Sequence, residues 1–155
     1  MNQQQTDIKF MREAMALAKL AAEKGEVPVG AILIQDSIII AKGSNSPIAN
    51  NDPTAHAEMI ALRNGGQYIK NYRFPGTTLY VTLEPCIMCM GAIIHARVQR
   101  LVFGAYDPKT GAAVSCYQIG SDNILNHQLE ITGGICKEEC SSLITNFFRQ
   151  RRKKY

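Results

Sequence analysis

Apolar and polar residues along this chain follow two periods, one typical of helices and the other of strands. Apolar residues recur at helical spacing over residues 7–25, and Gly25 suits a helix end, so we predict an amphipathic helix there. Two β-branched runs follow at residues 28–34 and 37–41, and the two polar residues between them are typical of a hairpin turn. The positions predicted to form the buried face of the first helix are Phe10, Ala14, Leu17, Ala18 and Ala21.

The remainder of the chain alternates helical and strand patterns. Thr54 is the predicted N-cap of a helix at residues 55–63, with Gly65 and Gly66 past its end. Residues 42–54 and 106–126 are rich in turn-forming residues, so the first is predicted as a loop and the second is left unassigned. Further helices are predicted at residues 87–97 and 136–152, and strands at 77–83, 100–103 and, with a weaker pattern, 128–132. The last helix would bury Cys140, Leu143, Ile144 and Phe147.

This order of elements predicts the fold class. Alternating helices and strands pack as a three-layer α/β/α sandwich, with helices on both faces of one sheet. The hairpin adds an antiparallel pair, so the sheet should be mixed. The 155 residues contain no repeat, low-complexity tract or long linker, and we therefore expect a single domain over residues 1–155.

Composition excludes several classes of protein. With 46% hydrophobic and 19% charged residues, the chain is not a disordered protein. Its longest apolar runs are far too short to span a membrane. The polar residues 1–6 lack the pattern of an export signal, so we expect a cytoplasmic protein without a membrane partner. Five cysteines, an odd number, exclude a fully paired disulfide framework and favour reduced thiols.

The net charge of +4 comes from the C-terminal end, where residues 149–155 carry five positive charges. The other residues together have a net charge of −1, so the body of the molecule is near neutral. The basic end is either an arm that binds phosphates or a solubilising helix end, and charge alone favours the second interpretation. Its basic residues are Arg149, Arg151, Arg152, Lys153 and Lys154.

Three metal-ligating residues fall at two predicted helix starts. His56 opens one helix, and Cys86 and Cys89 open the next, directly after Pro85. Helix N-termini stabilise thiolate charge, and the sulfurs of a Cys-x-x-Cys pair can converge on one ion. One imidazole and two thiolates form the ligand set of a catalytic zinc site, which keeps water in its fourth position.

Glu58 indicates what the predicted zinc site does. It lies two residues after His56, where its carboxylate can exchange a proton with water at the open position without binding the metal. A closed structural zinc site, completed by His95 or His127, is the alternative, but such a site has no use for a proton shuttle. His-x-Glu followed by Pro-Cys-x-x-Cys is the signature of the zinc deaminases.

The other three cysteines are not assigned to this site. Cys136 and Cys140 lie one helical turn apart and could contribute to a second metal site. No histidine or further cysteine lies near them in the sequence, so we interpret them as core or half-buried thiols. Cys116 has no partner in the sequence and is predicted to be inert.

The motifs and their flanking residues resemble the bacterial tRNA-specific adenosine deaminases, a family of the cytidine-deaminase-like superfamily. The resemblance extends from about residue 7 to residue 154, nearly the whole chain. Residues 114–118 (VSCYQ) and 119–123 depart from the family pattern, and no role is carried over to them. The segments that match best are 56–62 (HAEMIAL) and 79–92 (LYVTLEPCIMCMGA), followed by 26–31, 51–55, 107–112 and 147–152.

The resemblance implies a five-stranded mixed sheet and a homodimer with two active sites. It implies that the enzyme converts adenosine to inosine at the wobble position of the tRNA anticodon, chiefly in arginine tRNA. His56, Cys86 and Cys89 match the ligands of one Zn²⁺ per subunit, and Glu58 matches the proton shuttle.

The resemblance also implies contacts with the RNA. Asn45 would hold the flipped adenine, and the backbone around Ala57 would lie beside it. Asp107 would belong to a loop that contacts the anticodon. The residues implied to grip the anticodon stem-loop are the basic Arg149, Arg151 and Arg152.

The mechanism expected from these residues starts at Glu58, which takes a proton from water so that the hydroxide attacks C6 of adenine. A base in a single-stranded loop leaves its stack at the lowest cost, and an anticodon loop meets that need. With such a substrate, the basic end is expected to bind phosphate. A deaminase of a free base or nucleoside, such as guanine or cytidine, would share the zinc chemistry without needing that end. A zinc-stabilised RNA-binding module would not need Glu58.

Overall fold

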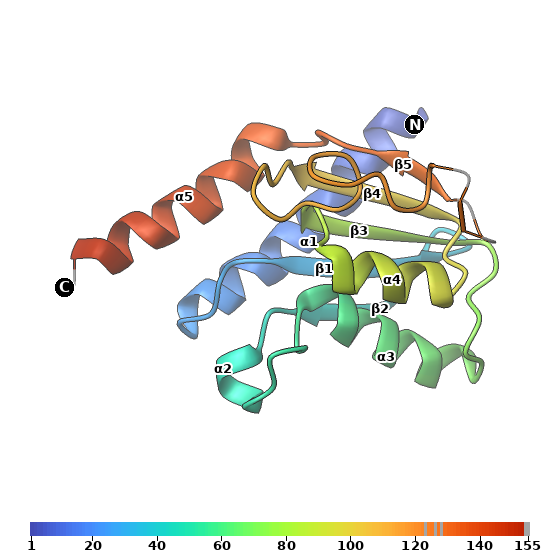
Figure 1. Ribbon diagram of the computed structural model, residues 1–155, viewed down its shortest axis with the longest axis horizontal. Helices are drawn as coiled ribbons and strands as arrows, with labels where there is room; N and C mark the ends of the chain where they lie inside the picture. The colour runs from blue at the N-terminus through green and yellow to red at the C-terminus, as the bar shows by residue number, and fades with distance from the viewer. Residues whose placement is uncertain (123, 126, 128, 154–155) are drawn as a thin grey trace.

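The computed structural model of the chain describes residues 1–122, 124–125, 127 and 129–153 (Figure 1). Its centre is a five-stranded sheet in the order β2-β1-β3-β4-β5. The strands are β1 (Gly30–Gln35), β2 (Ile38–Ser44), β3 (Thr77–Leu83), β4 (Arg100–Ala105) and β5 (Glu130–Thr132). The helices are α1 (Gln3–Glu23), α2 (Pro47–Asn50), α3 (Ala57–Ile69), α4 (Ile87–His95) and α5 (Lys137–Lys153).

The sheet is mixed, as the sequence predicts. β1 and β2 form an antiparallel hairpin, and the φ angles of 52° at Asp36 and 63° at Ser37 suit a tight two-residue turn. β1 also pairs antiparallel with β3, whereas β3 with β4 and β4 with β5 run parallel. Because α4 connects two parallel strands, the carboxyl ends of β3 and β4 meet at the same edge of the sheet.

Helices cover both faces of the sheet, which confirms the predicted three-layer sandwich. α3 and α4 lie together on one face, and α1 lies on the other with the first turns of α5 near it (Figure 1). Successive residues of each strand point to opposite faces and so divide between two cores. On β1, Leu33 packs on the side of α3 and α4, whereas Ile32 packs with Phe10 and Met11 of α1.

The predicted bounds of α3 were wrong at both ends. The helix continues through Gly65 to Ile69 and ends where Lys70 takes a left-handed φ of 59°. Gly65 lies inside the helix at a point where the sheet packs closely against it. A Cβ at this position would lie 2.5 Å from a methyl carbon of Leu33, which explains the glycine. Thr54 is not the N-cap. Its amide and hydroxyl donate to the Asp52 carboxylate at 2.8 and 2.7 Å, and His56 takes the cap position.

Other bounds differ by smaller amounts. The predicted loop at residues 42–54 contains the end of β2 and the short helix α2. α1 begins at Gln3, before residue 7, and β4 continues past residue 103 to Ala105. The described residues of segment 106–126 form turns and irregular backbone. Gln128, the predicted start of the last strand, lies outside the described residues, and β5 begins at Glu130.

α5 combines a packed start with a projecting end (Figure 1). Cys140 is buried, and the other three predicted core residues, Leu143, Ile144 and Phe147, are half-buried. Beyond them the helix extends away from the sheet and carries the basic residues into solvent, although Lys154 and Tyr155 lie outside the described residues. No helix in the described part of the chain is both long and apolar enough to cross a membrane.

Candidate active site

The candidate active site lies where two helices begin beside each other. His56 is the N-cap residue of α3, and Cys86 is the N-cap residue of α4, each with extended backbone angles. Neither side chain caps its own helix, so both are available to face each other. Cys89 follows in the first turn of α4 and is fully buried. The strand–helix connection after β3 therefore brings both thiols to the imidazole, as the sequence predicts.

The three side chains form a group that fits a zinc ion. Their ligand atoms all lie within 4.8 Å of one another, and His56 Nδ1 is 3.6 Å from Cys86 Sγ and 3.5 Å from Cys89 Sγ. Two ligands of a tetrahedral zinc with ordinary Zn–S and Zn–N bonds are separated by about 3.5 Å, so the observed spacing matches. No fourth His, Cys, Asp or Glu joins this group among the described residues.

The two histidines considered for a closed site lie elsewhere. His95 is exposed in the last turn of α4. The Nε2 atom of His127 lies 2.7 Å from the carbonyl oxygen of Val98, to which it donates a hydrogen bond. Cys136 and Cys140 are half-buried and buried, respectively, and form no metal group among the described residues. Cys116 is exposed.

Of the three side chains, Cys86 carries the charge that a metal ligand requires. Hydrogen bonding from Cys89 and His56 lowers the pKa of Cys86 to about 4, so this thiol is a thiolate at neutral pH. The hydrogen bond to Cys86, and then burial, raise the pKa of Cys89. Hydrogen bonding to Cys86 also raises the pKa of His56. Bound zinc displaces the shared protons, because its ligands are thiolates and neutral imidazole.

Glu58 lies in the first turn of α3, beside this cluster. Its side chain is 4% exposed, and burial raises its pKa to about 7. Its carboxylate interacts with Cys89, and the charge on the His56 ring acts to lower its pKa. Glu58 is not a member of the three-ligand group among the described residues, and it lines the adjoining pocket.

Asn45 lies just beyond β2 and reaches the start of α3. Its side-chain oxygen accepts the backbone N–H of Ala57 at 2.9 Å, which fixes the amide plane. Its N–H groups are therefore the part of the side chain that can meet a ligand in the pocket. Asn45 and Ala57 are paired directly, although they are twelve residues apart.

A pocket of about 170 Å³ opens in front of the cluster. Five of the ten candidate residues line it, including Asp107, which the chain supplies from the loop after β4. Arg149, Arg151 and Arg152 do not line it; they are exposed on the projecting end of α5. The residues that line the pocket are Val27, Val29, Asn45, His56, Glu58, Leu83, Glu84, Cys86, Asp107 and Thr110.

A larger, mostly apolar pocket of about 520 Å³ adjoins the first. The two pockets share Val27, Leu83, Asp107 and Thr110. The larger one also reaches α5, which connects the small pocket with the helix that carries the basic end. Its remaining lining residues are Tyr106, Pro108, Lys109, Ile144 and Phe148.

The sequence analysis missed two buried glutamates at the edge of the site. Glu26 is 3% exposed and accepts the backbone N–H groups of Ile48 and Ala49 at 3.2 and 2.8 Å. Glu84 is 2% exposed and accepts several hydrogen bonds from the loop after β4. In the sequence, Glu84 could have been identified only from its position between a buried strand and the Pro-Cys-x-x-Cys motif. Its partners, however, lie 23 to 31 residues away.

Comparison with known proteins agrees with this geometry. Residues 4–105 match the family described as the cytidine and deoxycytidylate deaminase zinc-binding region. The tRNA-specific adenosine deaminase of Haemophilus influenzae is 55% identical over 148 residues, which cover 95% of this chain and 86% of that protein. The tRNA-specific adenosine deaminase of Buchnera aphidicola subsp. Baizongia pistaciae is 51% identical, with coverage of 96% and 91%.

A solved structure gives the same result for the fold. It comes from a study of A-to-I editing by tRNA:A34 deaminases at the wobble position of transfer RNA, and it matches with a TM-score of 0.84. It is 41% identical and covers 87% of this chain and 98% of that chain. The matched family region includes His56, Glu58, Cys86 and Cys89. The chain therefore belongs to the cytidine and deoxycytidylate deaminase zinc-binding family and, within it, groups with the tRNA-specific adenosine deaminases.

Proposed function

We propose that this chain deaminates adenosine to inosine at the wobble position of a tRNA anticodon, chiefly in arginine tRNA. The observation that carries the proposal is a zinc-binding His56, Cys86 and Cys89 cluster with the buried Glu58 beside it at the end of a small pocket. The 55% identity to a tRNA-specific adenosine deaminase supports the choice of substrate.

The chemistry requires a proton to move twice. Zinc held by His56, Cys86 and Cys89 supplies a Lewis acid that makes water in the pocket a stronger acid. Glu58 takes a proton from the water that attacks C6 of adenine and delivers it to N1 of the ring. The carboxylate then takes the proton of the new C6 hydroxyl and delivers it to the amino group, so that the C6–N6 bond breaks and ammonia leaves. The oxygen of the water remains as the carbonyl oxygen of inosine.

Asn45 is proposed to hold the adenine in place, and Asp107 to belong to the loop that contacts the anticodon. With its oxygen bonded to the N–H of Ala57, Asn45 presents N–H donors to the ring nitrogens of a purine. Asp107 lines the same pocket from the loop after β4. A base that enters this pocket must leave its stack, which costs least in a single-stranded loop.

The basic end of α5 is proposed to bind the phosphates of the anticodon stem-loop. Removing residues 149–155 takes the formal net charge from +4 to −1. RNA affinity should fall, and each lost phosphate contact should reduce the log–log salt slope by about 0.7–0.9. Zinc content should stay unchanged because no ligand lies in that segment. Equal affinities and slopes for the two proteins, measured by titration against salt, would contradict the phosphate-binding arm.

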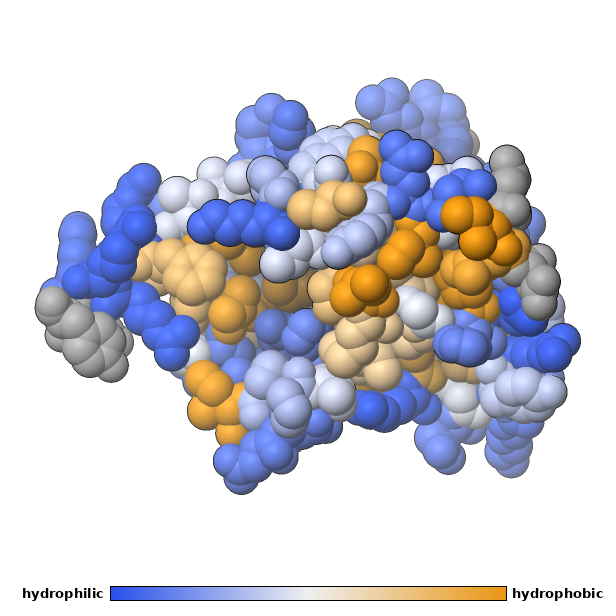
Figure 2. All heavy atoms as spheres, viewed as in Figure 1, coloured by the Kyte–Doolittle hydropathy of each residue, from blue (hydrophilic) through white to orange (hydrophobic). Residues whose placement is uncertain are grey.

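The homodimer that the family resemblance implies is also a proposal. Exposed apolar residues gather on the face that carries α4 (Figure 2). The large apolar side chains that are exposed include Ile87 of α4 at 58%, and Val114 at 45% and Tyr117 at 54% in the segment after β4. A second copy of the chain is the proposed partner of this face. Ile87→Asp should give monomers in sedimentation, whereas Ile38→Asp, on the equally exposed hairpin, should not. A monomeric wild-type protein would contradict the dimer.

The cytoplasmic location and single-domain organisation stay predictions.

One assay tests the proposed substrate. The zinc-loaded protein is incubated separately with an anticodon stem-loop, free adenosine, cytidine and guanine, and the released ammonia is measured. We expect ammonia from the stem-loop with wobble adenosine and little from the free compounds. Release from free guanine or cytidine alone would favour the free-base deaminase. RNA binding without any release of ammonia would favour the binding module.

A further inference from the structure

Glu84 is a buried carboxylate for which the proposed chemistry has no direct use. It lies between the end of β3 and Pro85, two residues before the ligand Cys86. It is 2% exposed and does not belong to the metal-ligand group. A buried carboxylate of this kind needs several hydrogen-bond donors around it, and the identity of those donors indicates its role.

Among the described residues, the donors to the Glu84 carboxylate come from the loop that follows β4. Its Oε1 atom accepts the backbone N–H of Asp107 at 3.0 Å and the hydroxyl of Ser115. Its Oε2 atom accepts the backbone N–H groups of Val114 and Ser115, both at 2.8 Å. One carboxylate thus binds the beginning and the end of the segment 107–115.

The middle of that loop lies directly on the same carboxylate. A Cβ at Gly111 would be 2.4 Å from Oε1 of Glu84, so only glycine permits this approach. The N–H of Ala112 also donates to the carbonyl oxygen of Pro85 at 2.8 Å. The loop is therefore tied along its length to the segment that leads into the zinc ligands.

The tied loop supplies one wall of the active-site pocket, through Asp107 and Thr110. The Asp107 side chain is itself held within the loop, since its Oδ1 accepts the N–H groups of Lys109 and Thr110 at 3.1 and 3.2 Å. Its Oδ2 accepts the Thr110 hydroxyl at 2.8 Å. The position of this wall relative to the zinc ligands depends on the bonds that Glu84 makes.

We propose that Glu84 is a positioning residue that holds the loop 107–115 against the zinc-ligand segment and so fixes the substrate-facing wall of the pocket. The inference rests on the proposed function for its substrate, but the clamp itself is a property of this chain. Glu84 lines the small pocket, but both of its oxygens accept hydrogen bonds from the loop, so its proposed action on the substrate is through the loop. Its loss should therefore impair substrate binding more than the chemical step.

A carboxylate suits this position better than an amide. Both oxygens of Glu84 accept, and three of the four donors are backbone N–H groups that cannot reverse their direction. In Glu84→Gln, the new NH₂ group must face at least one of those N–H groups. The substitution changes no volume, so it removes hydrogen bonds without opening a cavity. Gly111→Ala reaches the same loop by another route, because its methyl group pushes the loop away from an intact carboxylate.

The experiment compares wild type with Glu84→Gln, Gly111→Ala and the control Glu13→Gln. Glu13 is an exposed residue of α1, which covers the face of the sheet opposite to α3 and α4. Hydrogen exchange is measured at the amides of Asp107, Val114 and Ser115, and steady-state kinetics with the anticodon stem-loop. Both loop variants should exchange faster at these amides and raise KM by about tenfold, with kcat within about threefold of wild type. Zinc content should stay at one per chain, and the control should match wild type in every measurement.

Three results would overturn the proposal. Unchanged amide exchange in both loop variants would mean that Glu84 does not hold the loop. Faster exchange with unchanged KM would mean that the loop does not position the substrate. Loss of zinc in Glu84→Gln would mean that Glu84 acts on Cys86 instead. If the wild-type protein formed no inosine, the proposed function would fail separately. The amide exchange would then still confirm or contradict the clamp.

Discussion

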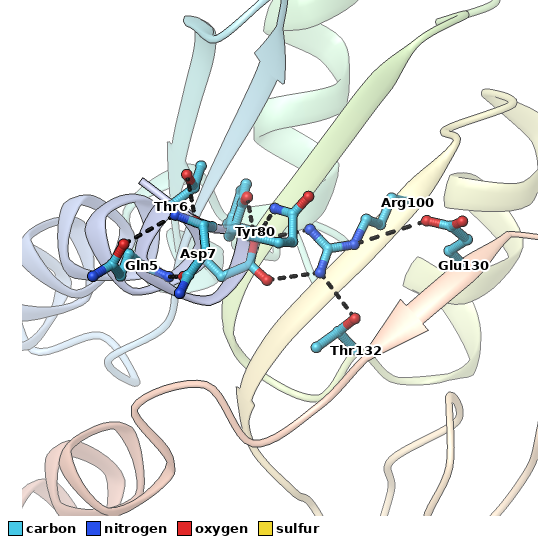
Figure 3. Close-up of polar contacts among 9 residues, drawn as sticks. Gln5, Thr6, Asp7, Tyr80, Arg100, Glu130 and Thr132 are labelled. Atoms are coloured by element: carbon cyan, nitrogen blue, oxygen red, sulfur yellow. Dashed lines mark hydrogen bonds and ion pairs between the residues drawn. The ribbon is translucent and has the colours of Figure 1, made fainter.

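Asp7 and Glu58 are both buried carboxylates, at 2% and 4% exposure, but their surroundings differ in kind. Asp7, on α1, is enclosed by donors from the chain itself (Figure 3). Arg100 donates to it twice, at 2.8 and 2.7 Å, and the hydroxyl of Tyr80 donates at 2.7 Å. Burial alone would raise the pKa of Asp7, but the hydrogen bonds from Arg100 and Tyr80 outweigh burial and lower it.

At Glu58 the balance between burial, which raises the pKa, and hydrogen bonding, which lowers it, is reversed. Burial dominates and raises the pKa to about 7, and no salt bridge to this carboxylate is found in the described part of the chain. Asp7 meets Arg100 at the first residue of β4, near the start of the parallel strands. Glu58 faces the pocket at their carboxyl ends, where ligands bind in open α/β sheets. A carboxylate fully paired within the chain stabilises the fold, whereas one facing a pocket can exchange protons with a substrate.

The largest effect should follow from Glu58→Ala. General acid–base catalysis contributes about 10²–10⁴-fold, and Glu58 is assigned more than one proton transfer. We expect kcat to fall by at least about 10⁴-fold, or about 5 kcal/mol of transition-state stabilisation. Zinc content and melting temperature should stay near wild type. Single-turnover kinetics with the stem-loop check this, and a variant within about tenfold of wild type would assign the proton transfer to another group.

The second effect concerns the metal and separates the ligand thiols from the others. Cys86→Ala removes one of three ligands, so zinc should be largely lost, together with nearly all activity. Cys116→Ser, an exposed thiol outside the cluster, is the matched control and should retain both. Metal analysis of the purified variants checks the prediction. Full zinc retention in Cys86→Ala would contradict the assigned ligand set.

The third effect should appear at Asp7 and change stability rather than chemistry. Asp7→Ala leaves the Arg100 guanidinium, 13% exposed, without its buried carboxylate partner, and removing one member of a buried pair costs about 3–5 kcal/mol. Urea unfolding should show that loss, while kcat and zinc content of the folded protein change little. Glu130→Gln is the control, because its 75% exposed carboxylate lies 4.0 Å from Arg100 and contributes little. A loss below about 1 kcal/mol in Asp7→Ala would contradict a stabilising role.

The smallest effect is the acid dependence of the same pair. The pKa of Asp7 in the folded protein lies below the ordinary aspartate value of about 3.9. Its contribution to stability is therefore complete above that value and is lost as the pH falls through the lower, folded pKa. The difference in unfolding free energy between wild type and Asp7→Ala should shrink below about pH 4. A difference that stays constant down to about pH 2 would mean that Asp7 does not titrate as described.

The sequence predicted the layers because periodicity and turn residues are local signals. The strand at 77–83 agrees with β3 at both ends. Gly65 was misread because its role depends on Leu33, which lies 32 positions away in the sequence and packs against it through the sheet. A glycine that permits close packing and a glycine that ends a helix look alike in one sequence.

The candidate site shows the same limit. His56, Glu58, Cys86 and Cys89 were predicted because each motif is short and its residue types are specific to metal chemistry. Glu84 was missed because a lone glutamate after a strand reads as a solvent-exposed residue. Its partners become visible only when the loop after β4 folds back onto it.

The measurement that tests the account most directly is the position at which inosine forms. Total tRNA lacking inosine is incubated with the zinc-loaded wild-type protein, with Glu58→Ala as the matched negative control. The RNA is then cleaved into fragments, which are identified by mass. The account predicts that adenosine is converted at the wobble position of arginine tRNA, only by the wild-type protein. Inosine at other positions to the same extent, no inosine at all, or equal conversion by Glu58→Ala would contradict it.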